Sequence, residues 1–302
     1  VAAVAPDIEN EDRAPLNLVF SVDCSGSMAG ENLELVKASV RAVASELRAG
    51  DVVSLVTWDT TASVMLDGFH ITGPDDPDLL DTVAGLTSGG STDLSLGLET
   101  AYELAARHAN SLSDNRVVLL SDGGANVGLT DTDLIGRYAA AYERDAIYLV
   151  GVGTTAPAAY ATVLMDDVTD AGRGAHVYID SSMEAEWQFT GERFLQNLQV
   201  SALDVRLAMT LPAGWVVDRF SGEEMSTVAA EVFPQNLGSN DQMLYHLTVH
   251  NCSGVDDPTF VFSADYQDRA GSPSTVGLTA TVSELVAAAD MNTVKAVAVI
   301  EA

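Results

Sequence analysis

Three oxygen-bearing side chains follow an apolar run near the start of the sequence. The run 18–22 is rich in β-branched residues and predicts a buried strand. Asp23, Ser25 and Ser27 come next at alternate positions, so an extended or turning backbone points them the same way. A carboxylate with two alcohol oxygens suits Mg²⁺ or Mn²⁺ rather than Zn²⁺ or Cu²⁺. Three ligands do not fill an octahedron, so further ligands are expected from distant loops, water or a partner.

Two later turns carry side chains of the same kind. Thr92 lies in the glycine-rich turn 89–93, and Asp122 directly follows an apolar strand expected at 116–121. In an open α/β sheet, ligands collect beyond the carboxyl ends of the strands. Each of the five residues, taken alone, is more often a turn former or a helix cap than a ligand. Their combination predicts one divalent-cation site.

The elements that must position these turns alternate between strand and helix as far as residue 198. Strands are expected at 15–22, 52–58, 62–66, 116–121, 146–152 and 175–179, and helices at 31–47, before 86, from 93, at 131–144, after 157 and at 181–198. The link between the second and third strands is too short for a crossover, so this pair is expected to be antiparallel. The pattern predicts a doubly wound α/β fold whose sheet is mainly parallel with one antiparallel edge strand.

Beyond residue 198 the pattern changes to short segments of alternating polarity separated by turn residues, which is typical of an all-β sandwich. The expected organisation is a leading arm (1–14), the α/β metal-binding domain (15–198), the β-sandwich (199–283) and a C-terminal helix (284–302). The residues Trp187, Phe194 and Leu198 have helical spacing and are interpreted as core.

The composition limits the classes of partner. The chain has 302 residues, with 14 basic and 44 acidic side chains and a formal net charge of -30. This charge excludes a nucleic-acid binder that relies on neutralising phosphates. No run reaches the ~18 apolar residues of a membrane helix. The sequence begins with Val1 rather than methionine, which is compatible with removal of a leader. Cys24 and Cys252 are expected to be unpaired.

The three polar turns together resemble the von Willebrand factor A-type domain, in the form found in bacterial envelope proteins. The matching motifs are Asp-x-Ser-Gly-Ser at 23–27, Gly-Gly-Ser-Thr-Asp at 89–93 and Ser-Asp-Gly at 121–123. In that family these loops form the metal-ion-dependent adhesion site. The resemblance implies that the hydroxyl ligands are Ser25, Ser27 and Thr92, and that Asp23 and Asp122 hold the ion directly or through water. It implies Mg²⁺, with Mn²⁺ or Ca²⁺ as substitutes.

The function expected from this resemblance is adhesive protein binding without catalysis, outside the cytoplasm. A coordination position left open on the ion would take an Asp or Glu carboxylate of a protein partner. One alternative is a Mg²⁺-dependent phosphotransferase or phosphatase with Asp23 as nucleophile. Against it, Ser25 stands where a second acid would be needed, and Lys37 lies inside the first helix. Another alternative is an intracellular subunit of an ATPase or metal-insertion complex. His246 and His250 share one strand face but lack a visible third ligand for zinc.

Overall fold

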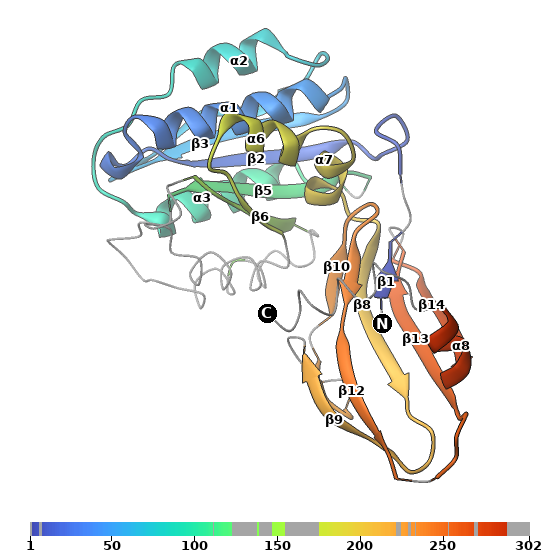
Figure 1. Ribbon diagram of the computed structural model, residues 1–302. Helices are drawn as coiled ribbons and strands as arrows, with labels where there is room; N and C mark the ends of the chain where they lie inside the picture. The colour runs from blue at the N-terminus through green and yellow to red at the C-terminus, as the bar shows by residue number, and fades with distance from the viewer. Residues whose placement is uncertain are drawn as a thin grey trace. The chain divides into compact units, whose positions relative to one another are not determined.

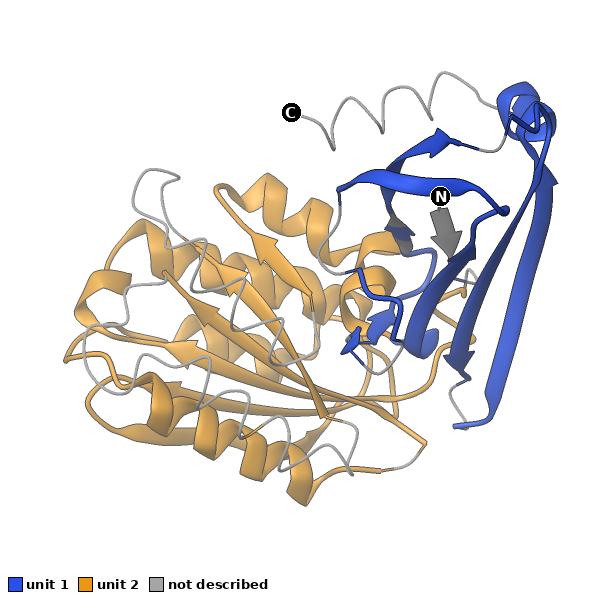
Figure 2. Cartoon of the chain, turned by 90° about the horizontal axis from the view of Figure 1, so that it is seen from below, with its two compact units in different colours: residues 1–7, 200–302 blue, residues 8–199 orange. Residues whose placement is uncertain are grey.

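The computed structural model describes residues 2–5, 8–110, 112–122, 138, 147–154, 175–221, 225–228, 231–232, 234–252, 254–268 and 271–288. The chain folds as two compact units (Figures 1 and 2). An α/β unit comprises residues 8–199, and a β-rich unit comprises residues 1–7 and 200–302. No helix in the described ranges is both long enough and apolar enough to cross a membrane.

The α/β unit is built on a sheet with the strand order β4-β3-β2-β5-β6-β7. Its strands are β2 (Leu16–Asp23), β3 (Val52–Trp58), β4 (Ala62–His70), β5 (Asp114–Ser121), β6 (Ile147–Gly153) and β7 (His176–Tyr178). Only β4 runs antiparallel to its neighbour, and the other pairs are parallel. All eight residues of β2 are buried, because this central strand has helices over both faces. The predicted mainly parallel sheet with an antiparallel edge is confirmed.

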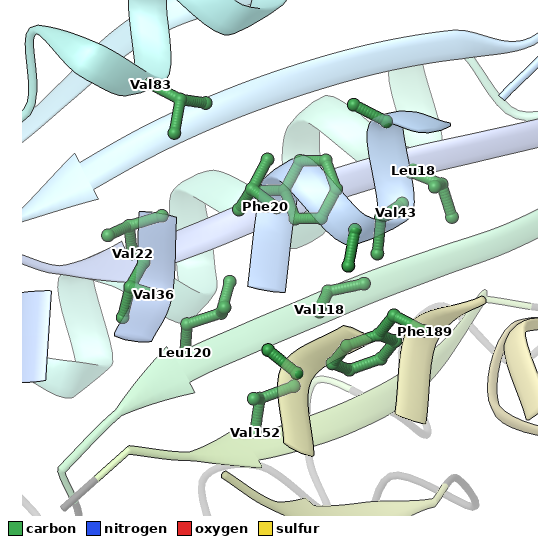
Figure 3. Close-up of a cluster of buried hydrophobic side chains, with 14 of the residues drawn as sticks. Leu18, Phe20, Val22, Val36, Val43, Val83, Val118, Leu120, Val152 and Phe189 are labelled. Atoms are coloured by element: carbon green, nitrogen blue, oxygen red, sulfur yellow. The ribbon is translucent and has the colours of Figure 1, made fainter. Parts of the chain in front are cut away.

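Two apolar clusters hold helices on the two faces of this sheet. On one face, Phe20 and Leu120 pack with Val36 of α1 (Glu31–Glu46) and Phe189 of α6 (Ser182–Phe189) (Figure 3). The helices α2 (Pro77–Ala84) and α7 (Gly191–Leu198) add residues to the same cluster. The other face packs on α3 (Leu94–Arg107). Because β-strand side chains alternate between faces, neighbouring residues of β2 serve different clusters.

The last helical region of this unit differs from its prediction. Instead of one helix over 181–198, the structure has α6 and α7, separated at Thr190, whose φ and ψ are -125° and 157°. Gly191 follows with a φ of +58°, a left-handed conformation that suits glycine. Trp187, predicted as core, is 53% exposed and stacks against the guanidinium of Arg193 instead. Of the helix predicted at 131–144, only residue 138 is described, and it is helical; the helix predicted after 157 lies outside the described residues.

A serine side chain caps the start of this helical region. The side chain of Ser181 accepts a hydrogen bond of 3.2 Å from the backbone N–H of Glu184. An N-cap serine of this kind satisfies one of the donors left free at the start of a helix. Phe194 and Leu198 are fully buried, so they belong to the core as expected.

The β-rich unit is antiparallel throughout its described strands. A sheet of order β10-β8-β13-β14 is accompanied by the ribbons β12-β9 and β1-β11. Its strands are β1 (Ala2–Val4), β8 (Ala202–Thr210), β9 (Trp215–Ser221), β10 (Gln235–Leu237), β11 (Gln242–Leu244), β12 (His246–Asn251), β13 (Thr259–Gln267) and β14 (Pro273–Thr281). Trp215 of the β12-β9 ribbon meets Phe260 of the sheet edge-on, with ring centroids 5.2 Å apart. The predicted all-β, antiparallel character of this region is confirmed, while the packing of its sheets as the two faces of a sandwich stays a prediction.

The two ends of the sequence contribute to the β-rich unit. Residues 2–4 were expected in a leading arm, but they form β1 and pair with β11 through Ala2–Leu244 and Val4–Gln242. Their partner strand lies about 240 residues further along the sequence, and no local sequence signal indicates that pairing. After β14, the helix α8 occupies Val282–Ala288. The remaining residues of the predicted C-terminal helix lie outside the described ranges.

Candidate metal centre

The two predicted acidic ligands lie at the same edge of the α/β sheet. β2 and β5 are parallel neighbours in register, with Val22 opposite Leu120. Asp23 therefore lies beside Ser121, and Asp122 follows at once. Asp23 is fully buried: its Oδ1 accepts 2.8 Å from the N–H of Ser25, and its Oδ2 accepts 2.9 Å from the hydroxyl of Ser121. Asp122 is 7% exposed. The sheet thus brings both carboxylates to one place, as parallel strands require.

The loop after β2 presents the two serines together. Their Oγ atoms lie 3.1 Å apart, which confirms that alternate positions in this loop point the same way. Ser25 is 1% exposed, whereas Ser27 is exposed. Ser27 lies in the short 3₁₀ turn η1 (Gly26–Met28), which leads into α1. The loop therefore runs from a buried carboxylate to a hydroxyl at the surface.

The turn that carries Thr92 is held against this loop by backbone hydrogen bonds. The N–H of Gly89 donates 2.7 Å to the carbonyl of Cys24, and the N–H of Gly26 donates 3.1 Å to the carbonyl of Gly90. Thr92 itself is 4% exposed. Asp93, next in sequence, caps α3 by accepting 3.2 Å from the N–H of Leu96. The two loops are thereby joined, although they are more than sixty residues apart.

A third turn, between β3 and β4, supports the site, and the sequence analysis did not predict this role. The carbonyl of Asp59 accepts 2.9 Å from the N–H of Asp93, and Oγ1 of Thr60 accepts 3.1 Å from the N–H of Ser91. A Cβ added to Gly90, whose φ is +81°, would lie 2.8 Å from Oδ2 of Asp59. The available signal was that Asp59 follows a buried strand just as Asp23 does. Ser121, the partner of Asp23, was likewise overlooked.

Burial makes the negative charge of Asp23 unfavourable. Desolvation raises the pKa of this carboxyl above its usual value, and the nearby charge of Asp122 raises it further. The hydrogen bonds from Ser25 and Ser121 partly offset this rise. Burial also raises the pKa of the Cys24 thiol to about 12, so without a metal ion that thiol is protonated at neutral pH.

These side chains fit a hard divalent cation. Two carboxylates and three hydroxyls are oxygen donors of the kind that Mg²⁺, Mn²⁺ and Ca²⁺ accept, and a cation would compensate the charge of two neighbouring acids. Within the part of the chain that the structure describes, no group of three His, Cys, Asp or Glu side chains could hold a metal ion. His246 and His250 lie on β12, and Nδ1 of His250 is 4.0 Å from Oδ2 of Asp218. Ligation by the five oxygen-bearing residues stays a prediction.

One more polar group at this edge is a threonine that follows β6. Thr154 has no exposed surface, and its N–H donates 3.0 Å to the carbonyl of Ser121. Its Oγ1 is buried without a hydrogen-bond partner among the described residues. Leaving a buried hydroxyl unsatisfied costs about 1–3 kcal/mol.

Comparison with known proteins finds a family profile that matches within the α/β unit. The profile of the von Willebrand factor type A domain matches residues 18–125. The uncharacterized protein YfbK of Escherichia coli is 29% identical over 262 residues, covering 83% of this chain and 44% of YfbK. The magnesium-chelatase 60 kDa subunit of Rhodobacter capsulatus is 33% identical over 120 residues, covering 38% of this chain and 20% of that subunit. The chain thus spans less than half the length of these relatives.

A solved structure shares the fold along nearly the whole chain. The von Willebrand factor type A protein from Catenulispora acidiphila aligns with a TM-score of 0.60 at 14% sequence identity. The alignment covers 98% of this chain and 77% of that one. At this identity the likeness concerns the fold alone.

Proposed function

Because the α/β unit is a von Willebrand factor A-type domain, we propose that it is a metal-dependent protein-binding module. A divalent cation, Mg²⁺ or in its place Mn²⁺ or Ca²⁺, is held by Asp23, Ser25, Ser27, Thr92 and Asp122. The ion binds an Asp or Glu carboxylate of a protein partner at a coordination position that the chain leaves open. Cell adhesion or assembly of proteins is the resulting role.

The observation that carries this proposal is the interlocking of the polar turns at one sheet edge. Asp23 is tied to Ser121, and the loop after it is tied to the turn of Thr92 by the Gly26–Gly90 and Gly89–Cys24 hydrogen bonds. Rigid positioning of this kind is what near-octahedral Mg²⁺ coordination requires. Because three of the five donors are neutral alcohols, the bound ion keeps enough positive charge to attract another carboxylate.

The same geometry disfavours phosphoryl transfer through Asp23, so we propose no catalysis. Each carboxylate oxygen of Asp23 already accepts a hydrogen bond, and the side chain has no exposed surface. A nucleophile needs an oxygen that can approach the phosphorus in line. Lys37, the lysine nearest in sequence, bonds Oε1 of Glu34 at 3.0 Å and is therefore engaged on α1.

The partner is expected to be a protein outside the cytoplasm rather than a nucleic acid or an anionic membrane surface. A net charge of -30 repels all anions at long range. At physiological salt, screening acts within ~8 Å, so a carboxylate at contact distance is bound mainly by the ion. Association is therefore expected to be slow at low ionic strength and faster when salt screens the repulsion. The appended β-sandwich favours an extracytoplasmic binding protein.

A second candidate follows from the similarity to the magnesium-chelatase 60 kDa subunit. In this alternative, the domain is an intracellular component of an ATPase or metal-insertion assembly. Both candidates use the same metal-dependent contact, but they differ in the compartment and in the protein captured. Fractionation of the native cells with an antibody to this chain distinguishes them, since an intracellular pool associated with an ATPase would favour the second.

Titration calorimetry tests the metal site. The wild-type protein is expected to bind one Mg²⁺ or Mn²⁺, and Ser27→Ala and Asp122→Asn are expected to weaken that binding at least tenfold. Matched controls are Ser63→Ala and Asp81→Asn, which alter an exposed serine and an exposed aspartate elsewhere in the unit. Undiminished affinity in both site variants would refute the assignment.

Capture of the partner tests the binding function. Immobilised wild-type protein is incubated with an envelope extract in Mg²⁺ or in EDTA, alongside the Asp122→Asn protein. Proteins retained only by the wild type in Mg²⁺ are candidate partners, and replacing an acidic residue at their contact should abolish retention. Capture that is indifferent to EDTA would contradict the mechanism.

A further inference from the structure

Thr154, the residue after β6, is hydrogen-bonded to the sheet edge that carries the proposed metal centre. β5 and β6 are parallel neighbours (Figure 1), and in their register Ser121 is opposite Gly153. Thr154 is therefore placed beside Asp122, one strand spacing away. Its N–H donates to the carbonyl of Ser121, whose hydroxyl donates to Asp23. Thr154 thus belongs to the same hydrogen-bonded edge as both predicted acidic ligands.

The hydroxyl of Thr154 is the unusual feature of this position. The side chain has no exposed surface, and its Oγ1 has no hydrogen-bond partner within the described residues. A hydroxyl has one proton to donate, and an unsatisfied buried donor is destabilising. Valine has nearly the same shape and would fill this place without that penalty. A threonine here is therefore poorly explained by packing alone.

Two acidic groups lie at this edge, and they differ in their position relative to Thr154. Asp23 already accepts from Ser25 and from Ser121, one bond at each oxygen. Asp122 lies closer in the strand register to Thr154, and an ionised carboxylate can accept several hydrogen bonds. Carboxylates that hold metal ions are commonly oriented by such a second hydrogen bond.

We infer that Thr154 is a positioning residue of the metal centre, whose hydroxyl donates a hydrogen bond to the Asp122 carboxylate when that carboxylate holds the divalent ion. This inference rests on the proposed function, and it adds a residue from a fourth strand end to the site. The bound ion would fix the position of the Asp122 side chain, and the hydrogen bond from Thr154 would keep the carboxylate oriented toward the ion. Thr154 touches neither the ion nor the partner.

The test compares Thr154→Val, which removes the hydroxyl and keeps the shape, with Thr154→Ser, which keeps the hydroxyl. Thr100→Val on α3 controls for the generic effect of this replacement, since its hydroxyl bonds the carbonyl of Leu96 at 2.8 Å. Each protein is melted in EDTA and titrated with Mn²⁺ by calorimetry. Thr154→Val is expected to melt in EDTA at or above the wild-type temperature, yet to bind Mn²⁺ roughly tenfold more weakly. Thr154→Ser is expected to stay within about threefold of wild type.

Thr154→Val should therefore not lower the melting temperature but should lower the Mn²⁺ affinity, and this combination distinguishes a positioning role from a packing role. A merely structural threonine would lower the melting temperature in EDTA and leave the Mn²⁺ affinity of the folded protein unchanged, and that result would overturn the inference. Wild-type affinity in Thr154→Val would also overturn it, while the proposed metal centre would stand. Absence of Mn²⁺ binding by the wild-type protein would instead reject the metal centre and this inference together.

Discussion

The hydroxyl of Ser121 donates a 2.9 Å hydrogen bond to Oδ2 of Asp23, which joins the last residue of β5 to the last residue of β2. This contact brings the loops after the two strands into one polar edge. It also leaves Asp23 fully buried and close to a second carboxylate, Asp122. The carboxyl group is therefore costly to ionise in the fold and well placed to hold a cation.

The pH dependence of stability in EDTA should reveal the cost of ionising Asp23. Its pKa in the folded protein is raised above the ordinary value of 3.8, mainly by burial, so the folded protein binds more protons than the unfolded chain above that pH. The contribution of Asp23 to the free energy of unfolding therefore falls as pH rises from 3.8 through the raised pKa. Across this pH window, the free energy of unfolding of Asp23→Asn should rise relative to that of the wild type, as measured by urea unfolding at several pH values.

Asp76 provides a control of opposite sign. Hydrogen bonds from the side chain and backbone of Thr72 lower the pKa of the Asp76 carboxyl. Its stabilising contribution is present above the ordinary value of 3.8 and is lost as pH falls through the lowered pKa. Asp76→Asn should therefore lose stability relative to wild type at neutral pH and approach it in acid. If the stabilities of Asp23→Asn and Asp76→Asn relative to wild type changed in the same way with pH, the direction assigned to one of the two pKa shifts would be wrong.

Gly90→Ala should weaken metal binding by displacing the turn that carries Thr92. A Cβ at this position would lie 2.8 Å from Oδ2 of Asp59, and the φ of +81° disfavours any side chain. We expect an affinity loss of about tenfold, the order seen when groups that orient metal ligands are disturbed. Mn²⁺ titration calorimetry measures it.

Gly50→Ala is the matched control for this replacement. Gly50 has a φ of +103°, but a Cβ there meets nothing within 4 Å. This variant should lose about 1 kcal/mol of stability or more through backbone strain, with unchanged Mn²⁺ affinity. Equal affinity losses in the two glycine variants would show that the effect of Gly90→Ala is global.

Asp51→Ala should be among the most destabilising replacements in the α/β unit. Its carboxylate pairs with the guanidinium of Arg13 at 2.8 and 2.5 Å, and both side chains are fully buried. Removing one partner leaves a buried charge unpaired, at a cost of about 3–5 kcal/mol in urea unfolding. Asp67→Ala breaks partly exposed contacts with Arg107 and His108 and should cost only about 0–1 kcal/mol. Similar losses in both variants would contradict this assignment.

The helices α6 and α7 allow two aromatic residues to be compared. Phe194 is fully buried, so Phe194→Ala should cost about 3–5 kcal/mol through lost burial and the cavity left behind. Trp187 is 53% exposed, and Trp187→Ala should cost under about 1 kcal/mol, chiefly the cation–π contact with Arg193. Urea unfolding of the two variants measures the difference, and comparable losses would mean that Trp187 is core after all.

The sequence by itself determined the alternation of elements, the antiparallel edge strand and the five candidate ligands. These features are local: apolar periodicity marks strands and helices, and short polar residues directly after buried strands mark the ligand edge. The Asp23–Ser27 spacing even predicted that the two serines would lie together, because side-chain direction alternates along an extended backbone.

Only the tertiary structure decided which distant groups support that edge. The contacts of Ser121 with Asp23 and of Thr60 with Ser91, and the burial of Thr154, depend on strand order and register. Those are set by the packing of the whole sheet and leave no fixed spacing in the chain. For the same reason, the pairing of Ala2–Val4 with Gln242–Leu244 and the exposure of Trp187 escaped sequence patterns. Hydrophobic periodicity predicts which residues share a face of a helix or strand, whereas tertiary packing decides which of those faces are buried.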